Sequence, residues 1–362
     1  MKTVYVLGAG ASKEYGLPIG DELKENISQL LRIPVNNFGE ISGGNQLIKS
    51  CFMSKWFGDL DYHMRTTRVA ELANISNRIS TNLPLAISID NYVDNHRENQ
   101  NIEKISKLAI SYCILQAERK SKMVNYKEKH RPLVDLNALS NTWIVKLFRT
   151  ITENRSFQEL ESVFRNITFV VFNYDRCLEY FLFNALLSYY SDSGATKETV
   201  RELINSITIF HPYGKIGVLP ELLENPSDGM QFGGEVDEKK LVEIASQINT
   251  FTQGTAESNN SVAGIRKALS ETQRQVYLGF AFHELNMELL RPKSATIHDQ
   301  VKIYATTLGM GESDAQIVKS KISNLVMGGI TNAQTNRVIK DNYKDVTCSS
   351  LFDSFRLSLS YT

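Results

Sequence analysis

Five short apolar runs, rich in valine, isoleucine, tyrosine and phenylalanine, constrain the fold of this chain more than any other feature. They are Thr3–Leu7, Ile167–Phe172, Ser206–Phe210, Gln275–Leu278 and Val301–Ala305. Most are followed closely by glycine, asparagine or histidine and then by a helical pattern. Continuous apolar strands that alternate with helices indicate an α/β fold, in which a parallel sheet carries helices on both faces. Ligands then bind beyond the carboxyl ends of the strands, so the polar residues found there are the candidates for chemistry.

Two stretches interrupt this alternation. Residues 46–154 are mostly helical in pattern, and apolar residues recur at spacings of three and four within Ile102–Lys122, which predicts a helical insertion. Residues 217–272 begin with glycine, proline and asparagine and continue into two predicted helices, Glu238–Ile248 and Val262–Leu269. We expect this second stretch to form a helical cap over the edge of the sheet.

The end of the chain has a different pattern. Residues 1–335 are expected to form one domain that includes both insertions, and residues 336–362 a C-terminal tail. Apolar and polar residues alternate in the last part of the tail, with apolar side chains at Phe355, Leu357, Leu359 and Tyr361. This period of two predicts a terminal edge strand or an interface segment.

Charge and composition exclude several classes of protein. The chain has 40 Lys+Arg and 40 Asp+Glu, so it lacks the net positive charge that attracts nucleic acid or anionic lipid, and we expect neither as a partner. The longest apolar run, Tyr180–Leu187, is far shorter than the ~18 residues of a membrane span. Four cysteines without paired spacing predict neither a zinc site nor a disulfide framework and fit a cytoplasmic protein. The apolar start, Val4–Leu7, is too short for an export signal.

The first strand runs directly into Gly8-Ala9-Gly10-Ala11-Ser12. Glycines after a buried strand let the backbone approach a diphosphate, and the first turn of the following helix offers unpaired N–H groups to it. We therefore predict a diphosphate-binding turn. A tight strand-to-helix turn without a ligand would use the same residues, and the third glycine of the usual dinucleotide motif is replaced by Lys13.

Polar residues also follow the second and third predicted strands. Asn173 and Asp175 come directly after Phe172, and side chains two residues apart on extended backbone point the same way, toward the crevice. The alternative is that one of them caps the next helix. His211 follows the third strand and can act as an acid, a base or a hydroxyl partner near neutral pH. The fourth strand ends at Gly279-Phe280, where glycine again permits close approach. We expect this end to border the adenosine half of a dinucleotide, and the alternative for His283, shortly after it, is that it only starts a helix.

Taken together, these motifs resemble those of the sirtuin-like family, and in particular the bacterial antiphage NAD hydrolases with this fold. The resemblance covers roughly residues 3–310. It is carried by GAGAS with the later Gly16-Leu17-Pro18, by Asn173-x-Asp175, and by His211 with Gly214. Ser88-Ile89-Asp90 before a helix and the segment Gly279-Phe280-Ala281-Phe282 are also similar to those defence proteins.

The resemblance implies a Rossmann-like fold and a role for each matched residue. Gly8, Ala9, Gly10 and Ser12 would hold the diphosphate and the nearby ribose, with Ala11, Pro18, Gly279 and Phe280 also in the binding site. Asn173 would position the ribose and the attacking water, Asp175 would contact the nicotinamide carboxamide, and His211 would bind or deprotonate a ribose hydroxyl. NAD is then a substrate, and no metal is needed.

Departures from the family narrow the expected activity. Family deacetylases carry four zinc-binding cysteines after the histidine, and none lies between His211 and Gly279, so deacetylation is disfavoured. Ile19-Gly20-Asp21 stands where those enzymes have Asp-Phe-Arg, and Pro212-Tyr213 separates His211 from Gly214. The expected function is an NAD glycohydrolase that acts as the effector of an abortive antiphage system.

Alternative functions and the partners follow from the same resemblance. A regulatory subunit that binds NAD or ADP-ribose without cleaving it would use the same site, and so would a protein ADP-ribosyltransferase. Because an uncontrolled NAD hydrolase would kill its host, we expect an off state that is set by homo-oligomerisation or by a separate defence protein. A ring ATPase of the HerA kind or a sensor subunit would suit the family.

Overall fold

The computed structural model describes residues 1–36, 40–59, 62–124, 134–249, 260–292, 298, 300–327 and 338–361. Six strands form one sheet in the order β3-β2-β1-β4-β5-β6, and every neighbouring pair is parallel. The strands are β1 (Thr3–Leu7), β2 (Ile167–Val171), β3 (Thr208–Phe210), β4 (Arg274–Leu278), β5 (Gln300–Thr306) and β6 (Val338–Lys344). This confirms the predicted α/β fold, and the strand order is that of Rossmann-like sheets, with the reversal between β1 and β4.

Alternate residues of the central strand supply two separate cores. Val4 and Val6 belong to one buried cluster, whereas Tyr5 and Leu7 belong to the other, because successive side chains of a strand point to opposite faces. All five residues of β1 are buried. The continuous apolar run therefore reflects a strand with helices on both sides, as in other parallel sheets.

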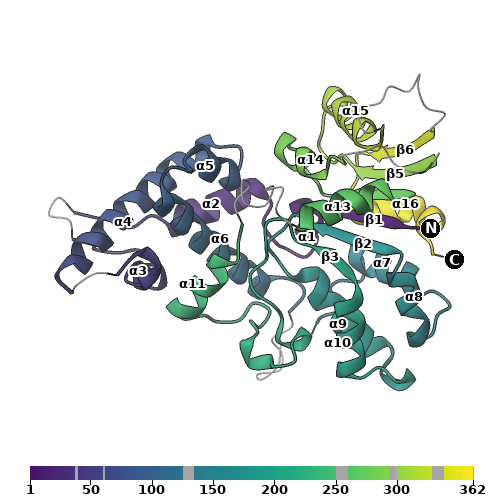
Figure 1. Cartoon of the computed structure of the whole chain (residues 1–362), viewed down its shortest axis with the longest axis horizontal. Helices are drawn as coiled ribbons and strands as arrows, with labels where there is room; N and C mark the ends of the chain where they lie inside the picture. Colours follow the sequence, from purple (N-terminus) through teal and green to yellow (C-terminus); the bar gives the residue numbers. More distant parts are fainter. Residues whose placement is uncertain are drawn as a thin grey trace.

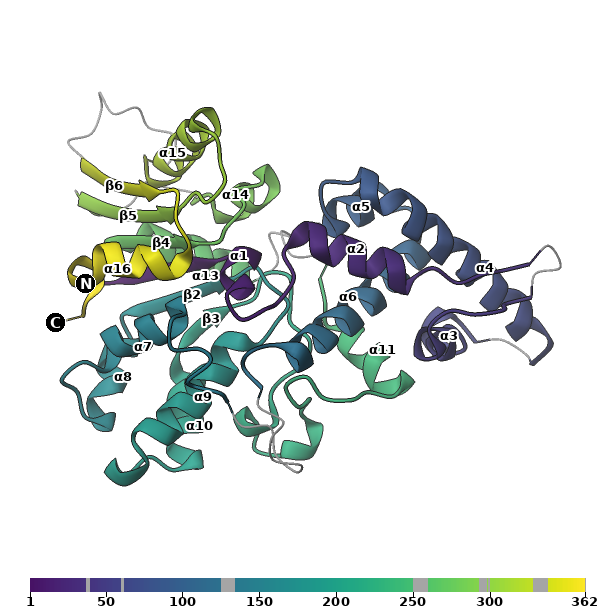
Figure 2. The ribbon, with the colours of Figure 1, turned by 180° about the vertical axis from the view of Figure 1, so that it is seen from behind.

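Helices cover both faces of the sheet (Figure 1, Figure 2). The cluster with Tyr5 takes in α7 (Trp143–Thr152), α8 (Leu160–Phe164), α9 (Cys177–Tyr189), α10 (Lys197–Ser206) and α16 (Cys348–Leu359). The cluster with Val4 takes in α13 (Asn260–Ser270), α14 (Glu284–Leu290) and α15 (Glu312–Met327). The short α1 (Ala9–Lys13) follows β1 directly.

A group of helices, which we call the helical lobe, stands beside the carboxyl edge of the sheet (Figure 1). It consists of α2 (Gly20–Leu30), α3 (Gln46–Phe52), α4 (Tyr62–Asn82), α5 (Ile89–Asn95), α6 (Gln100–Lys120) and α11 (Glu238–Ser246). Helix α6 is its centre and contacts α2, α4, α5 and α11. Short 3-10 helices lie at Lys55–Phe57, Leu83–Leu85, Phe157–Glu159, Ser191–Ser193, Pro220–Leu222 and Pro226–Asp228.

The two stretches that break the sequence pattern are each divided between the lobe and the sheet. Within residues 46–154, helices α3 to α6 belong to the lobe, whereas α7 packs against α16 and α9 on the sheet. Within residues 217–272, α11 packs on α6 and α3, whereas α13 packs on α14. No described residue of 217–272 lines the cavity discussed below.

The C-terminal region corrects the sequence analysis. The predicted terminal strand is helix α16, and the edge strand is β6, which lies upstream of it. Cys348, Leu351 and Phe352 form a buried stripe at helical spacing, and the side chain of Thr347 accepts a hydrogen bond from the Ser350 N–H as the N-cap. Phe355 has non-helical backbone angles, φ −127° and ψ 23°, and Leu357 is 87% exposed. The alternating apolar residues at the end of the chain therefore do not form one buried face.

Two general properties follow from the described residues. All four cysteines are buried and free. No helix in the described ranges has the length and apolar character that crossing a membrane requires.

Candidate functional site

A cavity of about 330 Å³ opens at the carboxyl ends of β1, β2 and β4, beside the point where the strand order reverses. Figure 2 shows α1 and the start of α2 between the sheet and the helical lobe, which is where this cavity lies. Its walls come from residues 8–23, from the start of α5, from the segment after β2 and from the loop after β4. The edge of the sheet at such a reversal is the usual ligand site of Rossmann-like folds.

The glycines of the first turn pack against the turn after β4. The Gly10 N–H donates to the Gly279 carbonyl at 3.0 Å, and the Gly8 N–H donates to the Leu278 carbonyl at 3.0 Å. A Cβ atom on Gly8 would lie 2.5 Å from the Gly279 oxygen. Glycine is therefore required here by backbone packing, and the Gly10 amide is committed to that contact.

Gly279 is the most constrained of these positions. Its φ is +55°, and an added Cβ would lie 2.1 Å from the Ala11 nitrogen. We expect Gly279→Ala to lower the free energy of unfolding by about 3 kcal/mol or more, because left-handed strain and overpacking add. Gly309→Ala is the matched control, since Gly309 has φ +76° and no neighbour within 4 Å, and it should cost only about 1–2 kcal/mol. If urea titrations gave the same loss of unfolding free energy for both variants, the packing role of Gly279 would be contradicted.

Asn173 is held in one orientation by the first turn. Its Nδ2 donates to the Gly8 carbonyl at 3.0 Å and to Ser12 Oγ at 2.9 Å. A carbonyl oxygen only accepts, so the amide N–H₂ must face it, and Oδ1 is left as the outward acceptor. No donor in the described residues reaches Oδ1, which can therefore accept a hydrogen bond from water or from a sugar hydroxyl.

Asp175 serves both the turn and the next helix. Its Oδ2 accepts from Ser12 Oγ at 2.8 Å, and its Oδ1 accepts from the Cys177 N–H at 3.1 Å. Asp175 thus bonds the first N–H of α9, but the N-cap of that helix is Arg176, so neither Asn173 nor Asp175 is the cap that the alternative predicted. Burial raises the pKa of the Asp175 carboxyl, and the hydrogen bonds from Ser12 and Cys177 act in the opposite direction.

His211 lies outside the cavity. Its Nε2 is 3.0 Å from Glu179 Oε1 on α9, and Lys215 Nζ lies 2.7 Å from the same oxygen. The His211 side chain is only 7% exposed, and its Nδ1 has no hydrogen-bond partner in the described residues. Burial alone would raise the pKa of the Glu179 carboxyl, but His211 and Lys215 together hold it well below its usual range. Glu179 therefore fixes the histidine ring.

Two polar residues that were noted in the sequence, but given no role in the site, also line the cavity. Asp90 of α5 accepts a hydrogen bond from the Tyr174 hydroxyl, and His283 lines the same cavity. Burial raises the pKa of Asp90, whereas burial and the nearby Lys321 lower the pKa of His283. His283 stands at the N-cap position of α14, as the helix-start alternative predicts, but its side chain makes no cap hydrogen bond there.

The loop that carries His283 is strained. Phe282 has φ +55°, a left-handed conformation that is a genuine outlier for a bulky residue. Its ring packs against Tyr277 and Phe280, with centroid separations of 5.7 and 5.1 Å. Such strain persists only where surrounding contacts enforce it, and here it fixes the direction in which the chain enters α14.

Aromatic rings and acidic groups are among the residues that line the cavity. Phe172, Tyr174, Tyr213 and Phe280 line it together with Asp90, Asp175 and Glu284. The Tyr213 hydroxyl donates to Asn286 Oδ1 at 2.5 Å. Among the lining residues that the structure describes, none is lysine or arginine. The cavity is therefore suited to a ligand with a flat, positively charged group.

A buried ion pair supports the turn that carries Asn173 and Asp175. Arg176 and Glu118 are both fully buried, and Arg176 Nη2 lies 2.6 Å from Glu118 Oε2. Glu118 also accepts from the Arg176 and Gly233 N–H groups, at 3.2 and 2.9 Å. Because Glu118 belongs to α6, this pair joins the helical lobe to the start of α9.

The residues proposed from the sequence therefore fall into two groups. The cavity is lined by Gly8, Ala9, Ser12, Pro18, Asn173, Asp175 and Phe280. The other four, Gly10, Ala11, Gly279 and His211, are not among the lining residues. The described residues contain no group of three or more histidine, cysteine or acidic side chains that could hold a metal ion.

Comparison with known proteins gives no further assignment. No protein-family model matches the chain, and no curated protein sequence matches it.

Proposed function

We propose that this protein is an NAD glycohydrolase, which cleaves NAD to nicotinamide and ADP-ribose. The observation that carries the proposal is the cavity at the strand-order reversal of a Rossmann-like sheet. Its lining contains acidic and aromatic side chains and no described lysine or arginine. An anionic ligand group would find no described lysine or arginine to pair with in this lining. The nicotinamide ring of NAD carries a positive charge and is flat, so it matches them.

The reaction has the same electrostatic requirement as the binding. Water adds to the anomeric carbon of the ribose, the carbon–nitrogen bond to nicotinamide breaks, the bonding pair leaves with the ring, and a proton is released. The transition state places positive charge on the sugar, so fixed carboxyl groups and dipoles stabilise it. Asp90 and Asp175, which both line the cavity, supply the carboxyl groups.

Asn173 is the residue best placed to orient the nucleophile. Its Nδ2 is fixed by Gly8 and Ser12, so Oδ1 can accept from the attacking water or from a ribose hydroxyl. The Gly8-Ala9 turn borders the cavity and would lie nearest the diphosphate. A volume of about 330 Å³ is near the lower end of the roughly 300–1,000 Å³ of ligand pockets, which suits the nicotinamide–ribose half of NAD.

Two histidines are candidates for contact with a ribose hydroxyl. His211 has that role in the resemblance to sirtuin-like enzymes, and its ring is oriented by Glu179. His283 lines the cavity itself. We propose His211 as the partner of the hydroxyl on the resemblance alone, because its ring lies outside the cavity lining. His283 is the alternative that the geometry offers, and alanine variants of the two histidines separate these roles.

The resemblance also supports a biological role. We propose that the enzyme is a cytoplasmic effector of antiphage defence, kept inactive until homo-oligomerisation or a separate defence protein, such as a HerA-type ring ATPase, activates it. The alternatives are an NAD-binding regulatory subunit without hydrolytic activity and a protein ADP-ribosyltransferase.

Chromatography of NAD breakdown products separates these functions. The purified protein is incubated with NAD, labelled in its adenosine half, with and without the proteins encoded beside it. Equal amounts of free nicotinamide and free ADP-ribose support hydrolysis. Label that remains attached to protein indicates transfer, and saturable binding with NAD left intact under every condition favours the regulatory subunit; either result would replace the proposed function.

A further inference from the structure

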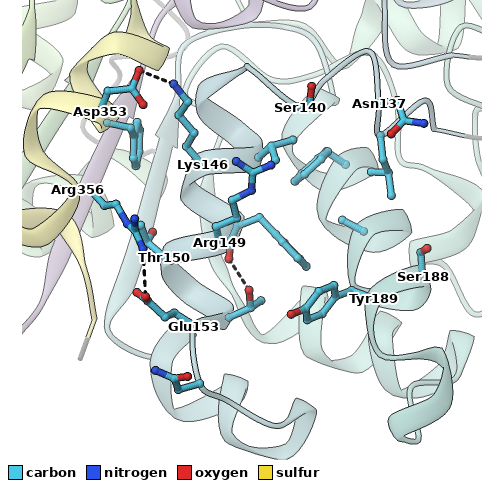
Figure 3. A pocket seen from close by; sticks show the side chains of 18 residues that line it. Asn137, Ser140, Lys146, Arg149, Thr150, Glu153, Ser188, Tyr189, Asp353 and Arg356 are labelled. Atoms are coloured by element: carbon cyan, nitrogen blue, oxygen red, sulfur yellow. Dashed lines mark hydrogen bonds and ion pairs between the residues drawn. The ribbon is translucent and has the colours of Figure 1, made fainter.

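A second cavity, of about 690 Å³, lies between α7, α9 and α16 and shares no lining residue with the first (Figure 3). We call it the α7–α9 groove. Its remaining wall is the segment before α7, which includes Leu136 and Asn137. The volume falls within the roughly 300–1,000 Å³ of sites that hold small ligands.

The floor of the groove is aromatic. The rings of Phe148 and Phe181 meet edge to face with centroids 5.9 Å apart, and those of Phe148 and Tyr189 do so at 5.6 Å. Tyr189 is 65% exposed, which is a large exposure for an aromatic side chain at the end of an apolar helix. A flat apolar body laid on this floor would remove that surface from water.

The charged residues of the groove leave one cation available. Two ion pairs join α7 to α16, Lys146 with Asp353 at 2.6 Å and Arg356 with Glu153 at 3.3 Å. Arg149 lies on α7 to one side of both pairs, toward Ser140 (Figure 3). It is exposed and has no ion-pair or hydrogen-bond partner through its side chain within the part of the chain that the structure describes.

We propose that the α7–α9 groove is a second binding site, for a small ligand with a flat aromatic body and a single anionic group. The aromatic body would lie on the exposed ring of Tyr189, behind which the rings of Phe148 and Phe181 are buried. The anionic group, a carboxylate, phosphate or sulfonate, would pair with Arg149, whose planar guanidinium binds such groups through two parallel hydrogen bonds. This proposal does not depend on the NAD glycohydrolase activity.

Two matched fluorescent probes test the proposal. 8-Anilinonaphthalene-1-sulfonate has an aromatic body with one negative charge, and N-phenyl-1-naphthylamine has the same body without the charge. The wild-type protein should bind the sulfonate about tenfold more tightly than the neutral probe, the size expected for a hydrogen bond to a charged group. Arg149→Gln should remove this difference in affinity, and Tyr189→Ala should weaken the binding of both probes.

Controls identify the site and the occupant. Arg97→Gln changes another exposed arginine, which lies in the helical lobe, and should leave both affinities unchanged. Displacement of the sulfonate by NAD, or equal affinities for the two probes in the wild type, would overturn the proposal. So would a wild-type dimer that Tyr189→Ala dissociates, because the groove would then be an interface between two copies of this chain.

Discussion

Replacement of Asn173 by alanine should reduce NAD hydrolysis by about two to three orders of magnitude, the usual loss when a group that orients the reacting atoms is removed. The amide is fixed by Gly8 and Ser12, so no neighbouring side chain can take its place without moving. Initial rates from product chromatography give the loss, and thermal unfolding shows whether the variant is folded.

Asn184→Ala is the matched control for this experiment. Asn184 lies on α9 and donates to the Tyr180 carbonyl at 2.8 Å, and it does not line the cavity. Its replacement should leave hydrolysis unchanged. Full turnover in the Asn173→Ala variant would remove Asn173 from the proposed site.

The same assay distinguishes the two histidines. We expect His211→Ala to abolish turnover, because the ring held by Glu179 is the proposed partner of the ribose hydroxyl. Turnover that survives in His211→Ala but is lost in His283→Ala would transfer that role to the histidine in the cavity wall.

Loss of Arg176 should strongly destabilise the folded protein. Arg176→Met leaves Glu118 fully buried without its countercharge, and breaking a buried pair in this way costs about 3–5 kcal/mol. The double variant Glu118→Met/Arg176→Met should lose less unfolding free energy than Arg176→Met alone, because it leaves no unpaired charge. Urea unfolding followed by circular dichroism measures all three free energies.

An exposed ion pair provides the comparison. Arg165 lies 2.6 Å from Glu161 with both side chains more than half exposed, so Arg165→Met should cost at most about 0.5 kcal/mol. The loss of unfolding free energy in the double variant at Glu118 and Arg176 is compared with the sum of the losses in the two single variants. If the two values are equal, the explanation by an unpaired charge is wrong.

The buried strands and the turn after β1 could be predicted from the sequence because each is a local pattern. Thr3–Leu7 is an uninterrupted apolar run with glycines behind it, and it forms the strand that was expected. β6 could not be found in this way. It is an edge strand with the polar sequence VIKDNYK, and an edge strand buries too little surface to need a continuous apolar run.

The far wall of the cavity depends on contacts that no local pattern contains. Asp90 meets Tyr174 across 84 positions of sequence, and nothing in the spacing of either residue indicates the other. Glu179 did carry a signal. It is one acidic residue in the otherwise apolar stretch CLEYFLF, and a carboxylate buried in such a helix requires a cationic partner, which the structure supplies as His211 and Lys215.

The pairing of β1 with β4 has a consequence for synthesis of the protein. Gly8 and Asn173 have left the ribosome long before Gly279 and His283 are translated, yet β1 is bracketed by β2 and β4 in the finished sheet. A nascent chain that ends before β4 therefore lacks one whole wall of the cavity. Interrupted translation, or a nonsense mutation upstream of residue 274, yields truncated products that lack a complete pocket. Such products cannot carry out a reaction that needs this pocket.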